Sequence, residues 1–190
     1  MKRATALFSL AFAAAACDSP SAPEVSSASF TFEATGEVRE SISGEARVLA
    51  VLPNGFTSVD QDGVRTEYSV TPILLADIRS PSAPQLHIGI IGDVTTTEYS
   101  VFRDGSERQF YADLSVPRPN GVTRRFSITG GRLTISKVTA ETIAGSFTFQ
   151  SGVYFDWPRD AQPGLTVTGV NTSQSVSGTF VAVRSDSNIF

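Results

Sequence analysis

The strongest constraint on this 190-residue chain is a two-residue alternation of apolar and polar side chains that recurs along most of its length. Successive side chains of a β-strand point to opposite faces, so this pattern predicts strands with one buried face and one solvated face. In FYADLSV (110–116), for example, the apolar residues all have one parity. The same alternation occurs in FTFEATGEV (30–38), VRTEYSV (64–70), VTRRFSI (122–128), RLTISKV (132–138) and GLTVTGV (164–170).

Turn signals separate these runs, and they predict short connections between strands. They are PNG (53–55 and 119–121), QDG (61–63), RDG (103–105) and TGG (129–131). Beyond the first residues, no segment has the apolar spacing of an amphipathic helix. We therefore expect an all-β domain of about ten strands, either an antiparallel β-sandwich or an up-and-down barrel-like domain. QLHIGII (85–91) is apolar on both parities apart from His87, which predicts a central strand.

A glycine recurs on the apolar face of three predicted strands. It is Gly44 in SISGEARV, Gly145 in TIAGSFTF and Gly178 in SVSGTFVA. The alternation continues through each glycine, whereas a ligand-cradling glycine loop would interrupt it. The pattern predicts that the core leaves no room for a side chain there, because a neighbour's bulk lies over the glycine or because the sheet coils.

Two of these strands carry a resemblance. The segments GGRLTISKVTAETIAGSFTFQ (130–150) and GLTVTGVNTSQSVSGTFVA (164–182) are similar to the C-terminal halves of small bacterial envelope lipoproteins of unknown function. Those proteins have a G-x-L-x-I strand followed by I-x-G-x-F strands. Since that family has no assigned catalytic residues, the resemblance implies no chemistry for this chain.

The N-terminus predicts export and lipid anchoring. Lys2 and Arg3 precede an apolar run of signal-peptide length (4–16), which ends at Cys17, the only cysteine. AAAC resembles the lipobox of bacterial lipoproteins, in which a signal peptide (1–16) is removed and the cysteine is lipidated. Ala14 stands where that motif usually has leucine. An ordinary secretory signal beside an unrelated cysteine is the alternative.

A flexible tether and one domain follow the signal. Residues 17–28 are rich in Ser, Pro and Ala, and we expect them to connect the lipidated cysteine to a single all-β domain at 29–190. Cleavage would leave 13 of the 15 basic residues against 19 acidic ones, a net charge of −6. This charge disfavours nucleic acid as a partner. We expect a membrane partner through the lipid anchor, together with an unknown envelope protein or glycan.

Motifs for catalysis and metal binding are scarce. His87 is the only histidine, so a Ser-His-Asp site would have to use it, but a structural or surface role in its strand is the expectation. Asp60 and Asp62 before Gly63 resemble the front of a calcium loop, whose remaining ligands are missing. A hairpin turn explains the same residues. We expect no cofactor and no metal, with calcium as the minor alternative.

The segment SGVYFDWPRDAQPG (151–164), expected to be a loop, is the best candidate for recognition. It places Tyr154, Phe155 and Trp157 near Arg159, and aromatic residues with arginine are typical anchors of binding surfaces. Alternatively, these aromatics cap the open end of the core. We expect a non-catalytic domain for binding or scaffolding. The alternative is a surface hydrolase acting on glycans or peptides, which would need converging titratable groups such as Asp93 with Glu98.

Overall fold

The computed structural model describes residues 27–59, 62–102, 109–158 and 167–184. In these ranges the secondary structure consists of strands and one turn of 3-10 helix, η1 (Pro119–Gly121), which confirms the predicted all-β fold. The strands are β1 (Ser29–Thr35), β2 (Glu40–Val48), β3 (Leu52–Val59), β4 (Arg65–Ala76), β5 (Gln85–Ile91), β6 (Glu98–Val101), β7 (Gln109–Pro117), β8 (Val122–Ser127), β9 (Gly130–Val138), β10 (Thr142–Pro158) and β11 (Val170–Arg184). No helix in the described ranges is long and apolar enough to cross a membrane.

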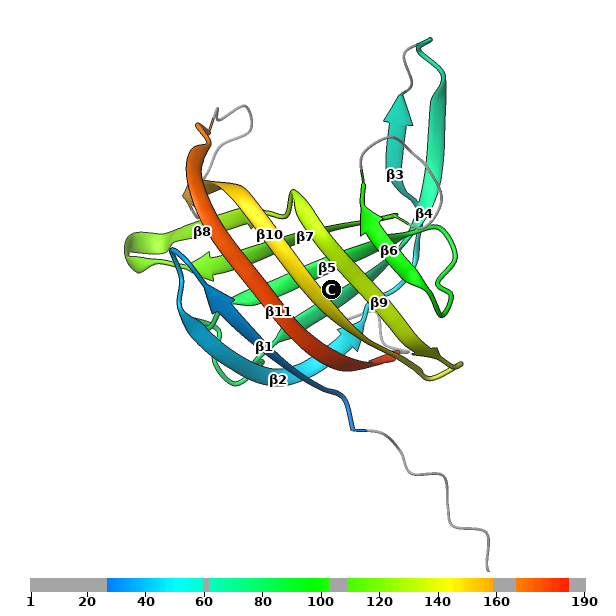
Figure 1. Cartoon of the computed structure of the whole chain (residues 1–190), viewed down its shortest axis with the longest axis horizontal. Coiled ribbons are helices and arrows are strands. Elements are labelled where there is room, and N and C mark those ends of the chain that lie inside the picture. The colour runs from blue at the N-terminus through cyan, green and yellow to red at the C-terminus, as the bar shows by residue number, and fades with distance from the viewer. Residues whose placement is uncertain (1–26, 60–61, 103–108, 159–166, 185–190) are drawn as a thin grey trace, which may run out of the picture.

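The strands form one eleven-stranded sheet whose pairings close into a ring (Figure 1). From strand to strand, the ring runs β1, β11, β10, β9, β6, β7, β5, β4, β2 and back to β1. β8 pairs with β10 and β7, whereas β3 pairs with β4 alone in the described chain. This ring-like sheet agrees with the predicted sandwich or barrel-like domain.

Two pairings are parallel, which differs from the antiparallel sheet predicted from the short turns. β1 lies antiparallel between β11 and β2, so these two neighbours run in the same direction. Beyond the start of β1 at Ser29, β11 and β2 meet directly, and Ala182–Arg184 pair in parallel with Ala46–Val48. The second parallel pairing is the short contact of β6 with β7. The first follows from the short length of β1, which leaves its two neighbours in contact.

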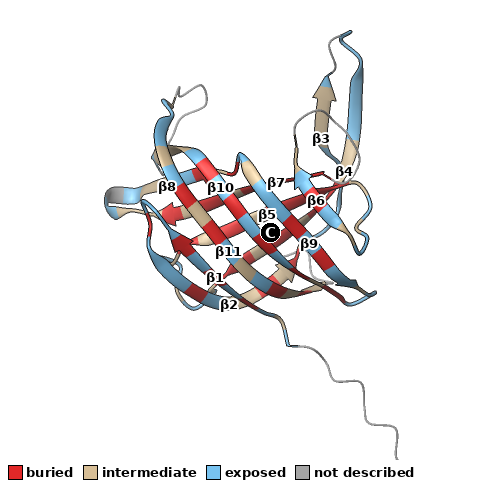
Figure 2. Ribbon diagram, in the orientation of Figure 1, coloured by how far each residue is buried: buried red, intermediate tan, exposed pale blue. Residues whose placement is uncertain are grey.

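The apolar parity of the strands fills the inside of the ring, so that buried residues alternate with more exposed ones along most strands, among them β1, β7 and much of β10 (Figure 2). Phenylalanine rings form much of this core; the Phe149 ring lies 4.9 Å from that of Phe110 and 4.8 Å from that of Phe147, centroid to centroid. QLHIGII forms β5 between β4 and β7, which confirms the predicted central strand. GLTVTGV differs from its prediction, because Val167–Gly169 lie outside any strand and β11 begins at Val170.

The repeated glycines lie opposite phenylalanines of neighbouring strands. Gly145 pairs with Phe180, Gly178 pairs with Phe32, and Gly44 pairs with Phe30. A Cβ atom on Gly178 would lie 2.7 Å from the Cβ of Phe32, closer than real Cβ atoms come to their neighbours. On Gly145 it would collide with the backbone carbonyl of Thr134. The glycines are therefore packing positions, as the unbroken alternation predicts.

Candidate functional site

Side chains that could bind a ligand or exchange a proton gather on the outer surface of β5, β7, β8 and β10. Cross-strand pairing puts His87 of β5 beside Asp113 of β7, which in turn pairs with Ser127 of β8. One step along the strands, Ser115 pairs with Arg125, and Arg125 pairs with Phe155 of β10. The intervening residues of β5, β7 and β8 point into the core, so these side chains share the outward parity. We call the following set the histidine face: His87, Tyr111, Asp113, Arg125, Phe155 and Trp157.

Asp113 is the electrostatic centre of the histidine face. Its Oδ1 atom accepts a hydrogen bond from Ser115 Oγ at 3.2 Å and forms an ion pair with Arg125 Nε at 3.5 Å. The Asp113 side chain is 26% exposed and the Arg125 side chain is 50% exposed. The arginine can therefore reach a ligand while its partner carboxylate remains largely covered.

Burial and neighbouring charges shift the titration of two further groups on the histidine face. Burial lowers the pKa of His87, an effect that Asp113 opposes and Arg125 reinforces. Burial also raises the pKa of Tyr111, as does the charge of Asp113. At neutral pH these shifts favour a neutral imidazole and a neutral phenol, each able to donate and accept hydrogen bonds.

A shallow groove of about 230 Å³ opens at one end of the histidine face, lined by Arg125, Ser127, Phe155, Trp157 and Val167. The guanidinium carbon of Arg125 lies 5.9 Å from the centroid of the Trp157 ring. The chain at Gly169 lies against Phe155, since an added Cβ atom there would lie 3.0 Å from the Phe155 ring. Two aromatic side chains and one cation thus border the same groove.

The structure divides the aromatic residues of the predicted recognition loop between two faces. Tyr154–Trp157 belong to β10, which is a strand through Pro158 because Val122–Ser127 of β8 pair with it. Tyr154 points inward, with its ring 5.5 Å from that of Phe126, and caps the core. Phe155 and Trp157 lie on the outer surface with the groove. Arg159 lies outside the described residues.

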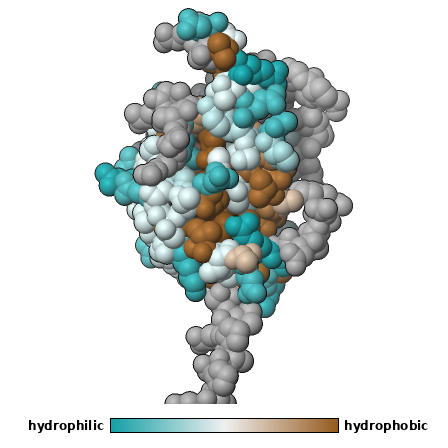
Figure 3. Space-filling model, turned by 90° about the vertical axis from the view of Figure 1, so that its right-hand side faces the viewer, coloured by the Kyte–Doolittle hydropathy of each residue, from teal (hydrophilic) through white to brown (hydrophobic). Residues whose placement is uncertain are grey.

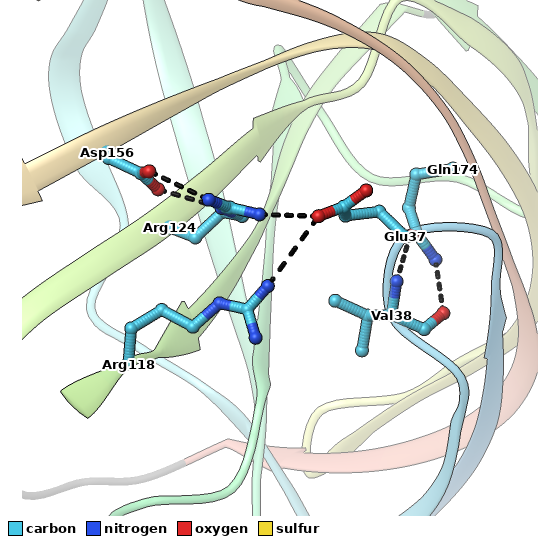
Figure 4. Close-up of polar contacts among 6 residues, drawn as sticks. All are labelled: Glu37, Val38, Arg118, Arg124, Asp156 and Gln174. Carbon is cyan, nitrogen blue, oxygen red and sulfur yellow. Dashed lines mark hydrogen bonds and ion pairs between the residues drawn. The ribbon is translucent and has the colours of Figure 1, made fainter.

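A cluster of charged residues at one end of the ring joins three segments that are distant in sequence (Figure 4). Arg124 donates two hydrogen bonds of 2.8 Å to the carboxylate of Asp156 and one of 2.6 Å to Glu37. Arg118 lies 3.8 Å from the same Glu37 oxygen. The guanidinium carbon of Arg124 also lies 3.9 Å from the centroid of the Tyr154 ring. Hydrogen bonds from Arg124 hold the pKa of Asp156 below its usual value.

Beside this cluster, Gln174 fixes the turn between β1 and β2. Its side chain accepts a hydrogen bond of 2.9 Å from the Val38 N–H and donates one of 3.2 Å to the Val38 carbonyl. Gln174 is only 1% exposed and Val38 is 5% exposed. The Gln174 amide thus satisfies the turn backbone where the turn covers the core, which marks this end of the ring as structural.

The described residues do not assemble the metal site or the Ser-His-Asp site that the sequence left as alternatives. No group of three or more His, Cys, Asp or Glu side chains there could hold a metal ion. Asp62 is exposed at the tip of the β3–β4 hairpin, and its predicted calcium partner Asp60 lies outside the described residues. Cys17, the predicted lipidation site, also lies outside them. Between described residues, no hydrogen bond joins His87 to Asp113 or to Ser115.

Comparison of the chain with protein-family models, curated proteins and solved structures finds no match.

Tyr111, Asp113 and Arg125 are the residues of the histidine face that sequence reasoning did not single out. Alternation alone places Tyr111 and Asp113 on the polar parity of FYADLSV. Their meeting with His87, some 25 residues earlier, depends on the register between β5 and β7. The signal in the sequence was that the outward positions of this strand carry Tyr and Asp, where a purely solvated face could carry Ser and Thr.

Proposed function

We propose that this chain is a lipid-anchored protein of the bacterial cell envelope whose β domain binds a ligand without catalysis, through the histidine face. One observation carries the proposal: Arg125, Phe155 and Trp157 converge on one outer groove, beside the titratable His87 and Asp113. Arginine and tryptophan are the residues that most often dominate the energy of binding surfaces. The envelope location rests on the signal-like N-terminus and Cys17.

The dimensions of the groove limit what it can hold. Pockets for drug-sized molecules measure about 300–1,000 Å³, so a groove of about 230 Å³ suits one ring or one side chain of a larger ligand. Trp157 offers an aromatic surface for stacking, and Arg125 and Ser127 offer hydrogen-bonding groups at its border. A glycan or a protein segment of the envelope fits this combination. Nucleic acid is disfavoured by the net charge of −4 of the whole chain.

A lipid-anchored surface hydrolase acting on glycans or peptides is the alternative. The specific observation in its favour is that His87 and Asp113 are cross-strand neighbours with Ser115 and Ser127 on the same face. Such an enzyme would need His87 to take the proton of a serine hydroxyl. Release of new reducing ends or amino groups from envelope material, abolished by His87→Gln, would favour the hydrolase over the binding module.

Affinity capture tests the proposal. Full-length protein is immobilised and incubated separately with glycan and protein fractions of the cell envelope. Trp157→Ala and Arg125→Ala should each reduce capture of the ligand at least about tenfold, since hot-spot truncations cost about 2 kcal/mol or more and about 1.4 kcal/mol corresponds to tenfold in affinity. Arg132→Ala is the matched control, because Arg132 lies on β9, away from the histidine face, and its side chain is 75% exposed. Capture that survives both substitutions but fails with Arg132→Ala would refute the proposed face.

A further inference from the structure

The hairpin of β3 and the first part of β4 stands away from the ring (Figure 1). Val70–Leu75 of β4 pair with β5 as part of the ring, whereas Arg65–Tyr68 pair with β3 in the part of the chain that the structure describes. Figure 3 views the molecule from the side that carries the hairpin and shows a small hydrophobic patch among polar residues near the top. The projecting segment therefore presents side chains and backbone that the ring does not cover.

The free edge of β3 lacks the usual protection of an edge strand. Within the part of the chain that the structure describes, β3 has β4 as its only strand neighbour. Natural edge strands avoid pairing with other chains through charged side chains, prolines or bulges. The β3 sequence LPNGFTSV contains no charged residue, and its proline and bulge lie before Phe56. The stretch Phe56–Val59 is thus an unguarded template for another strand.

Exposed apolar side chains are concentrated on the same hairpin. Of six large hydrophobic residues that are exposed in the described chain, four lie on or beside it: Val51, Leu52, Val59 and Val64. Val59 is 64% exposed and Val64 is 57% exposed. Such a concentration on a projecting element marks an interaction surface rather than scattered surface residues.

The base of the hairpin is fixed by aromatic packing. The Phe56 ring lies 4.4 Å from that of Phe102 and 6.1 Å from that of Tyr111. Tyr111 itself occupies the space over Gly89, where a Cβ atom would collide with its ring. The edge of β3 is therefore held in its extended form before any partner arrives, which lowers the entropic cost of pairing.

The net charge of the chain and the absence of charge on β3 indicate which partner binds the β3 edge. Two copies of a chain with a net charge of −4 repel one another over most of their surface, so a neutral patch is where they can approach. Because β3 is uncharged, its pairing with an identical strand brings no like charges together. An anionic lipid surface fits less well, since the exposed Asp62 lies at the tip. We propose that β3 pairs antiparallel with β3 of a second copy across a two-fold axis, joining the two sheets through their hairpins.

Cysteine cross-linking tests this dimer in the full-length, membrane-bound protein. Thr57→Cys, Ser58→Cys and Val59→Cys are made separately, mildly oxidised and analysed on non-reducing gels. In an antiparallel two-fold pair, one central position faces itself or its neighbour within the 4.4–6.8 Å Cα separation that a disulfide requires. We expect a product of twice the chain mass that peaks at one of these positions. Ile78→Cys, 53% exposed and outside the hairpin, is the matched control, and the wild-type chain gives the background from Cys17.

Val59→Lys in the Thr57→Cys chain should reduce the dimer to background, because it places a charge on each of the two paired edges. An equal thermal unfolding temperature shows that the variants are folded. The proposal is overturned if no β3 cysteine gives more dimer than Ile78→Cys, or if the product has a mass other than twice that of the chain. Shielding of the β3 cysteines from an aqueous maleimide by lipid vesicles, without dimer, would also overturn it.

Discussion

At the scale of single residues, the glycines opposite phenylalanines show how much the alternation of apolar and polar residues can predict. The parity of each glycine is enough to predict that it faces the core. Gly145 keeps the inward parity of its strand, and its missing side chain leaves room for Phe180 on one side and Ile135 on the other. The sequence could show that each glycine faces the core. It could not show which neighbour occupies the space, because that depends on registers with β9 and β11.

Gly145→Val should destabilise the fold by about 1 to 3 kcal/mol, because the added side chain meets the Thr134 backbone as well as the Phe180 ring. Gly152→Val is the matched control: it lies in the same strand, and an added Cβ atom there meets nothing within 4 Å. Urea unfolding of both variants measures the difference. Equal midpoints for Gly145→Val and the wild type would contradict the packing role.

His87 gives a second test at this scale, through the pH dependence of stability. Because burial lowers its pKa in the folded protein, the unfolded chain binds the proton more readily near pH 6.5, the ordinary histidine value. The stability of the wild type should therefore fall as the pH drops from 7 through 6.5 and below. His87→Gln should flatten this part of the profile, measured as unfolding temperature against pH. Parallel profiles for the two proteins would show that His87 is not responsible.

At the scale of the element, β10 contributes residues both to the charged cluster and to the groove. On one face, Tyr154 packs against the core and Asp156 belongs to the charged cluster. On the other face, Phe155 and Trp157 border the groove. From the sequence alone, these residues are expected to form one loop with either a binding role or a capping role. Because β8 pairs with this part of β10, the residues form a strand, and alternate side chains point to opposite faces. One face therefore has the capping role and the other borders the groove.

Arg124→Ala should destabilise the domain by about 1 to 2 kcal/mol, since charge-assisted hydrogen bonds are stronger than neutral ones but the two carboxylates remain about 40% exposed and screened. Arg132→Ala, whose ion pair with Glu98 is on the surface, should change stability by less than about 0.5 kcal/mol. Thermal and urea unfolding distinguish them. An equal effect of both substitutions would mean that the Arg124 cluster does not fasten the ring.

At the scale of the whole molecule, the number and type of elements followed from periodicity and turn residues, whereas the closure of the ring did not. Closure depends on β1, whose short length lets β11 and β2 meet in parallel beyond Ser29. The pairings of β5 with β7, β7 with β8 and β8 with β10 bring His87 and Trp157, which are far apart in sequence, onto one surface. Histidine and aromatic residues could be named from the sequence, but their assembly into one face required the strand order.

The predicted anchor is tested on the intact protein by mass spectrometry. The mature chain should begin at Cys17 and carry the mass of a diacylglyceryl group and an amide-linked acyl chain, and Cys17→Ser should abolish both. Two or three acyl chains on one residue are sufficient for stable membrane attachment, since each buried methylene contributes about 0.8 kcal/mol. A mature wild-type N-terminus without acyl chains would refute the lipid-anchored part of the proposed function.

The fluorescence of Trp157 tests the central claim most directly, because it is the only tryptophan in the chain and it borders the groove. Full-length protein is titrated with the envelope fraction that affinity capture identifies. We expect a saturable change in emission, which Arg125→Ala shifts to at least about tenfold higher ligand concentration and Arg132→Ala leaves in place. Emission that stays constant while ligand binding is demonstrated by capture would contradict recognition by the histidine face.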